Sequence, residues 1–158
     1  MQNDKALREH VVNLLTKSEA HADFDAAVKD LPAKLRGEKP TGAEHSPWQL
    51  LEHLRIVQWD LIEYAVNPKH VSPEFPEGYW PKDPAPPNAT AWDKSVESFR
   101  KDRKRLCELV MAEKTDLLAK IPYAGGQTLL RQALVTADHN AYHVGQLVLL
   151  RRLLGAWG

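Results

Sequence analysis

The sequence predicts an all-α protein, a four-helix bundle with a long proline-rich connection between its second and third helices. Three observations lead to this prediction. Apolar residues recur at helical spacing in four long segments, and no segment shows the apolar–polar alternation of a strand. Seven of the 11 prolines fall within one 20-residue window. Amphipathic helices must bury their apolar faces together, so we expect one domain over residues 1–158.

The first long helix is expected over residues 4–17, because Leu7, Val11 and Leu14 share one helical face. A short amphipathic helix over residues 24–31 follows, and a proline directly after it ends the helical pattern.

The second long helix has the clearest start signal in the sequence. Ser46 is suited to the N-cap, and Pro47 fits the first turn, where its missing N–H is not needed. Gln49 completes a capping box. The apolar face continues to about Tyr64, and Asn67-Pro68 ends the helix.

The proline-rich connection, residues 67–89, is incompatible with a helix or a central strand. It contains Phe75, Tyr79 and Trp80, large apolar groups that a solvated linker does not need. We expect the connection to cross one end of the bundle and pack there. It can contribute to function or only cover the core, and the sequence leaves both readings open.

The last two helices are separated by a glycine pair. The third long helix is expected to begin at Thr90, with Asp93 placed to help cap it. Residues 125–126, both glycine, break the chain before the fourth helix, which should start near Gln127 or Thr128 and run to about Leu154, where Gly155 can terminate it. The long connection allows the second and third helices to lie parallel.

Charge and cysteine content exclude several classes of function. Twenty-one basic residues balance 21 acidic ones, which argues against a nucleic-acid-binding protein. The chain has a single cysteine, Cys107, which excludes an intramolecular disulfide. We interpret Cys107 as a small apolar residue of the third helix. No stretch is apolar enough for a membrane span, and the polar N-terminal segment does not resemble a signal peptide. We therefore expect a cytoplasmic protein without a membrane partner.

The fourth helix carries the strongest chemical signal, the His-x-x-x-His pair His139 and His143. Residues four apart lie on the same face of a helix, with their Cβ atoms about 6 Å apart. Two imidazoles at this spacing can converge on one metal ion. Gln132, Thr136 and Gln146 lie along the same face, and a polar stripe in so apolar a helix needs a partner. The pair alone is a weak pattern, because two exposed or hydrogen-bonded core histidines explain it more often than a metal ion does.

A third histidine on another helix strengthens the metal interpretation. His53 lies at the margin of the apolar face of the second long helix, and bundles build metal sites from facing helices. It can also be a hydrogen-bonded core residue. His10 occupies a similar position on the first helix and is an alternative third ligand. The remaining histidines lie near segment ends and are expected to be solvated: His21, His45 and His70.

Two segments of the chain, residues 46–54 and 137–147, resemble the signature regions of the DinB-like superfamily, and residues 148–154 are similar as well. The resemblance implies a four-helix bundle of up-down-down-up arrangement that is often a homodimer. It also implies a divalent metal, usually nickel or zinc. The residues that match the ligand positions are His53, His139 and His143.

The resemblance and the histidines together suggest a metal-dependent enzyme acting on a small molecule, either a thiol-dependent S-transferase using a low-molecular-weight thiol or a hydrolase. No residue stands out as a catalytic acid or base. Helical phase suggests three residues that support the ligands, Gln49, Asp60 and Gln146. Three aromatic residues are expected to form pocket walls, Trp48, Tyr79 and Trp80.

Two other hypotheses fit the same residues. In the first, the metal only stabilises a binding or dimerisation module without turnover. In the second, the protein is a metal-free bundle in which the histidines satisfy one another.

Overall fold

The computed structural model describes residues 2–17 and 19–158, and four long helices dominate this part of the chain. These are α1 (Gln2–Thr16), α3 (Pro47–Val66), α4 (Ala91–Met111) and α5 (Leu129–Leu153). The shorter elements are α2 (Phe24–Val28) and the 3₁₀ turns η1 (Ala33–Leu35) and η2 (Glu77–Tyr79). The described residues form no β-strand, so the predicted all-α fold is confirmed. None of their helices combines the length and apolar character that crossing a bilayer requires.

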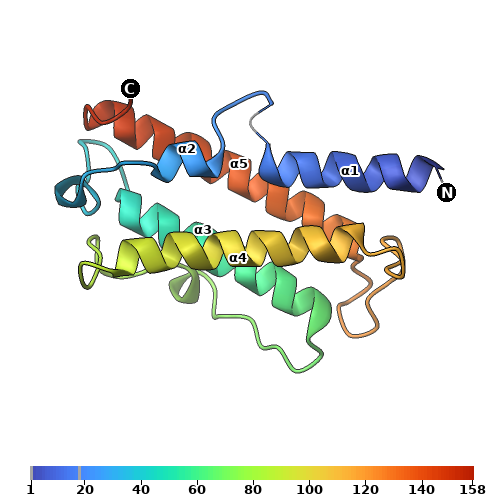
Figure 1. Ribbon diagram of the computed structural model, residues 1–158. Coiled ribbons are helices and arrows are strands. Elements are labelled where there is room, and N and C mark those ends of the chain that lie inside the picture. The colour runs from blue at the N-terminus through green and yellow to red at the C-terminus, as the bar shows by residue number, and fades with distance from the viewer. Residues whose placement is uncertain (1, 18) are drawn as a thin grey trace.

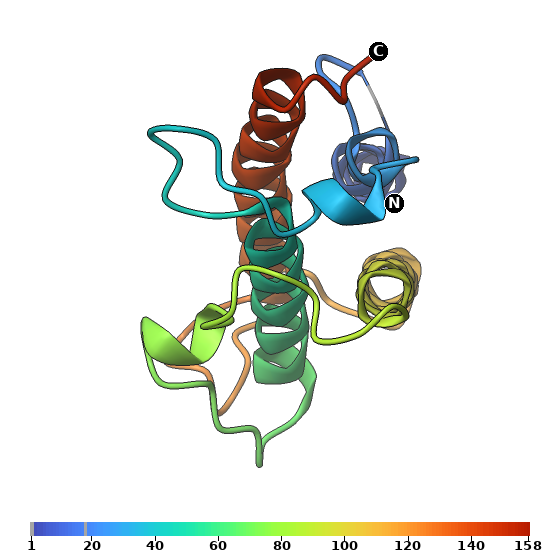
Figure 2. The ribbon, with the colours of Figure 1, turned by 90° about the vertical axis from the view of Figure 1, so that its left-hand side faces the viewer.

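The long helices pack around α3, which contacts both α4 and α5, while α1 packs against α4 and α5. Figure 1 shows α1 and α5 running in one direction and α3 and α4 in the other. Figure 2 shows α1 and α4 on one side of the α3–α5 pair, with most of the connection between α3 and α4 on the other side. This connection therefore lies against a face of α3 that no long helix covers.

The predicted helix ends are formed by local hydrogen bonds. The Ser46 hydroxyl accepts from the Gln49 N–H at 3.2 Å, and the Gln49 side-chain oxygen accepts from the Ser46 N–H at 3.1 Å, which completes the capping box. Thr128 caps α5 through its side chain, and Gly155 follows the helix with φ of 67°. Thr90 precedes α4 as expected, but its side chain makes no capping hydrogen bond.

The core consists of two apolar clusters. The first joins α2 to the beginning of α3, the beginning of α4 and the end of α5, with Trp48, Leu54, Phe99 and Leu147 among its members. The second joins α1 to the opposite ends of the same helices and includes Val11, Ile62, Leu106 and Ala133.

A buried polar layer separates these clusters. Gln58 of α3 is fully buried, donates to the Phe99 carbonyl at 2.8 Å and accepts from the Asn140 side chain at 3.0 Å. Gln132 and Thr136 are buried on the same face of α5, and the Thr136 hydroxyl donates to the Gln132 carbonyl. Gln58 is therefore the partner of Asn140 on the last helix, while the predicted stripe residue Gln146 pairs with His143.

The proline-rich connection runs back along α3 instead of crossing one end of the bundle as expected. Gln49 Nε2 donates to the Pro81 carbonyl at 3.0 Å, and the Ser46 hydroxyl donates to the Pro84 carbonyl. In Figure 1 the segment leaves the end of α3 and returns beneath it. Polar side chains along one face of α3 hold it in place. Phe75 takes no part in this packing, because it is 79% exposed.

Candidate metal centre

Three histidines converge between α3 and α5. The Nε2 atom of His53, on α3, lies 3.1 Å from Nε2 of His143 and 3.0 Å from Nε2 of His139, both on α5. All three donor atoms lie within 4.8 Å of one another. The contact between α3 and α5 thus brings together residues about 90 positions apart, and the spacing of four places both α5 rings on one face.

Hydrogen bonds on the outer side of two rings fix which nitrogen carries the proton. Nδ1 of His53 lies 3.0 Å from the Tyr79 carbonyl oxygen, and Nδ1 of His143 lies 2.6 Å from the side-chain oxygen of Gln146. Because these oxygens only accept hydrogen bonds, each Nδ1 is the donor. In the neutral rings Nε2 then carries a lone pair, and the lone pairs of His53 and His143 face each other.

Burial favours the neutral form of these rings. Burial lowers the pKa of His53 to about 4 and that of His139 to about 3, and the pKa of His143 is lowered as well. The charge that His143 would carry lowers the pKa of the other two further. At neutral pH the three imidazoles are therefore uncharged, which is the form that ligates metal ions.

The donor set fits a single metal ion. Imidazole nitrogens are suitable ligands for zinc, nickel and copper. The zinc–nitrogen bond length is about 2.0–2.1 Å. Two nitrogens bound to one such ion at right or tetrahedral angles lie about 2.9–3.4 Å apart. The observed separations of 3.0 and 3.1 Å from His53 Nε2 fall within this interval. A cation between the nitrogens also removes the lone-pair repulsion that neutral rings otherwise face.

Trp80 covers one face of His53, with ring centroids 3.7 Å apart and planes inclined by 4°. The ring of His45 also stacks on Trp80, with ring centroids 3.8 Å apart. The sequence suggested Trp80 as a pocket wall, and the structure places it directly against His53. His45 was expected to be solvated, but it is half-buried in this stack.

A second group of side chains supports the site from α3. The Asp60 carboxylate accepts from the Tyr79 hydroxyl at 2.8 Å and lies 2.7 Å from Nε2 of His70. Tyr79 in turn offers its main-chain carbonyl to His53. Asp60 thus reaches the ligand through Tyr79. His70 was also expected to be solvated, yet its side chain is 6% exposed.

The other suggested residues lie at different distances from the histidines. Gln146 contacts His143 directly. Gln49 instead belongs to the capping box at the start of α3 and donates from its side chain to the Pro81 carbonyl. Trp48 lies in the first apolar cluster with 6% exposure. The alternative ligand His10 is exposed on α1 and lies outside the histidine group.

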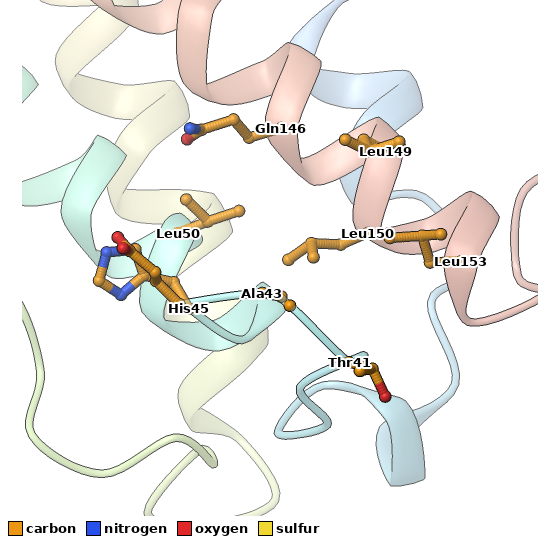
Figure 3. Close-up of a pocket in the computed structure, with 10 residues that line it drawn as sticks. Thr41, Ala43, His45, Leu50, Gln146, Leu149, Leu150 and Leu153 are labelled. Carbon is orange, nitrogen blue, oxygen red and sulfur yellow. The ribbon is translucent and has the colours of Figure 1, made fainter.

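A pocket of about 360 Å³ lies between the loop before α3 and the last turns of α5 (Figure 3). Gln146 belongs both to this pocket and to the ligand environment, because it accepts from His143. The lining comes from the loop before α3, one residue of α3 and the last turns of α5: Thr41, Gly42, Ala43, Glu44, His45, Leu50, Gln146, Leu149, Leu150 and Leu153.

A helical bundle with three convergent histidines from two neighbouring helices defines a protein class with a candidate metal centre between those helices. The family model of the DinB superfamily matches residues 18–147, a range that includes all three histidines. The chain therefore belongs to the DinB superfamily, and the resemblance noted in the sequence is confirmed. No curated protein and no solved structure matches it.

Proposed function

We propose that His53, His139 and His143 hold one divalent metal ion, nickel or zinc, and that the protein is a metal-dependent enzyme. The observation that carries this proposal is the convergence of the three Nε2 atoms, with the Nδ1 protons of two rings directed outward to oxygen acceptors. Structural metal sites usually provide four protein ligands, whereas catalytic sites provide three. The three-histidine set supports the catalytic type.

The bound ion would supply Lewis acidity, which lowers the pKa of a water or thiol bound to it. The chain's own residues position the ligands for this role. Tyr79 and Gln146 orient the rings of His53 and His143 and increase the basicity of Nε2 by accepting the Nδ1 protons. Trp80 excludes water from one face of His53.

The proposed reaction is either thiol-dependent S-transfer to a small electrophile or hydrolysis of a small molecule. Both need the same ion and the same open coordination position, and differ in whether a thiol or a water reacts. The low-molecular-weight thiol is proposed because of the family membership. The balanced charge of the chain favours a small molecule over a nucleic acid as substrate.

A second candidate function is a metal-stabilised module without turnover. The ligands come from two helices, so one ion would cross-link α3 to α5 next to the buried polar layer. This role requires the same metal and predicts a large loss of stability on chelation. It predicts no activity in thiol-transfer or hydrolysis assays with the loaded protein.

The test is the metal content of protein purified without a histidine tag, measured by elemental mass spectrometry. We expect about one equivalent in the wild type and loss of the ion in His53→Ala, His139→Ala and His143→Ala. His10→Ala is the matched control and should keep the metal, because His10 is exposed outside the cluster. Circular dichroism establishes that each variant is folded.

Two results would overturn the metal proposal. One is a wild type that takes up neither nickel nor zinc after incubation with each. The other is a folded His139→Ala variant with unchanged metal content. Metal binding without turnover in either assay would favour the second candidate.

A further inference from the structure

The pocket shown in Figure 3 continues the seam between α3 and α5 beyond the histidines. Leu50 precedes His53 by one helical turn on α3, while Gln146 and Leu150 follow His143 by one and two turns on α5. Because α3 and α5 run in opposite directions (Figure 1), these displacements lead toward the same end of the bundle. The pocket is therefore the direct extension of the metal centre along the seam.

The lining of this pocket is polar beside the histidines and mainly apolar along the last turns of α5, where Thr41 of the loop also lies (Figure 3). Gln146 contacts His143, and His45 stacks on the Trp80 ring that covers His53, so both mark the end near the ligands. Figure 3 shows these two side chains on one side of the pocket. The leucines of the last turns of α5 lie on the other side: Leu149, Leu150 and Leu153. A ligand that fits this lining has a polar end at the metal and an apolar remainder.

Two of the lining leucines present much of their apolar surface to the pocket and to solvent. Leu149 is 55% exposed and Leu153 is 59% exposed. The pocket volume of about 360 Å³ lies in the range of small-molecule sites, about 300–1,000 Å³. A second protein copy would instead need roughly 800 Å² of surface on each partner, and a concave pocket of this size is better filled by a small molecule.

We infer that this pocket binds the apolar part of the substrate, which is a small amphiphile carrying an alkyl chain or a comparable apolar group next to its metal-binding end. The inference rests on the proposed metal site. Leu50, Leu149, Leu150 and Leu153 bury the chain, and the pocket determines how long a chain the enzyme accepts.

The test is the binding of alkyl hydroxamates to the zinc-loaded protein, measured by isothermal titration calorimetry. The hydroxamate group binds the metal, and its chain is lengthened from acetohydroxamate to hexanohydroxamate. We expect the affinity to rise about two- to fourfold for each added methylene, as expected for burial of a CH₂ group. The affinity for acetohydroxamate measures the metal centre alone.

Two variants alter the pocket without touching the ligands. Leu149→Ser with Leu153→Ser removes exposed apolar lining, and Ala43→Phe fills the pocket. Both should abolish most of the gain with chain length and leave acetohydroxamate binding unchanged. The matched control is Leu134→Ser, because Leu134 is 44% exposed on α5 but lies outside the pocket.

The outcomes separate the two proposals. If acetohydroxamate does not bind the zinc-loaded protein, the ion has no open coordination position, so the proposed catalytic role is wrong and the substrate inference is overturned with it. If acetohydroxamate binds but longer chains bind no better, the metal site stands and the pocket inference is overturned. The inference also fails if the lining variants keep the full gain. It fails as well if sedimentation shows that Leu149→Ser with Leu153→Ser dissociates a wild-type dimer, since the leucines then form a contact between copies.

Discussion

The Nδ1 atom of His53 donates its proton to the main-chain carbonyl oxygen of Tyr79, 26 residues further along the chain and 3.0 Å away. The hydroxyl of the same tyrosine donates to Asp60 at 2.8 Å, so Tyr79 is anchored to α3 through its side chain and orients His53 through its main chain. The path of the proline-rich connection thus determines which nitrogen of His53 faces His139 and His143.

Removing the anchoring hydroxyl should weaken metal binding without removing a ligand. Tyr79→Phe keeps the carbonyl that accepts from His53 but loses the hydrogen bond to Asp60. We expect zinc affinity to fall about tenfold, because groups that orient a ligand typically contribute 10- to 100-fold. Competition with a chromogenic chelator measures the change. Tyr123→Phe is the control, since that hydroxyl binds the Ala65 carbonyl at the far end of α3. Equal affinities of the two variants would contradict the role of Tyr79.

The metal-free protein should lose stability as the pH falls from about 6.5 to 4. Burial holds the pKa of His53 at about 4 and that of His139 at about 3, below the ordinary value of 6.5. At pH values between these lowered pKa values and 6.5, the unfolded chain binds more protons than the folded one, so acid favours unfolding. Above pH 6.5 this stabilising difference is fully present.

Urea unfolding of the metal-free protein at several pH values measures this effect. In a His53→Gln/His139→Gln variant the free energy of unfolding should depend less on pH across the same interval. His21→Gln serves as the control, because His21 is exposed. A wild type and double variant with the same pH dependence would show that the two rings titrate normally in the folded protein.

The capping box at the start of α3 should contribute measurably to stability. Ser46→Ala removes the acceptor for the Gln49 N–H and the donor to the Pro84 carbonyl. We expect a loss of about 1–2 kcal/mol in the free energy of unfolding, measured in urea. Thr90→Ala is the matched control at the start of α4, where the threonine side chain makes no capping bond, and it should lose less than about 0.5 kcal/mol. A Ser46→Ala variant as stable as the control would contradict this assignment.

The buried guanidinium of Arg8 should contribute more to the free energy of unfolding than the capping box does. It donates to the carbonyls of Val110, Ala112 and Thr115, which follow or end α4. Arg8→Leu leaves these acceptors without their partner, and we expect a loss of about 3 kcal/mol or more. Thermal and urea unfolding measure it. Lys5→Leu on the same helix is the control, because the Lys5 side chain is 75% exposed and should change stability by less than about 0.5 kcal/mol. Similar losses in both variants would indicate a general effect of altering α1.

Local sequence signals were sufficient for the helices and for the histidine pair of α5. The Ser46–Gln49 box, the glycines near residue 125 and the periodic apolar residues act within a few positions, where backbone geometry alone decides the outcome. The same holds for His139 and His143, because a spacing of four on a helix always places two side chains on one face.

The surroundings of the histidines depended on the tertiary structure. Tyr79 and Trp80 reach His53 only because the proline-rich connection returns along α3, and a segment without helical periodicity carries no local signal for its path. For the same reason helical phase could associate Asp60 with the site but not identify Tyr79 as the link between them. The sequence by itself determined which helices form and which residues can be ligands. Only the tertiary structure decided which oxygen atoms orient those ligands and where the pocket lies, because both depend on contacts between segments far apart in the chain.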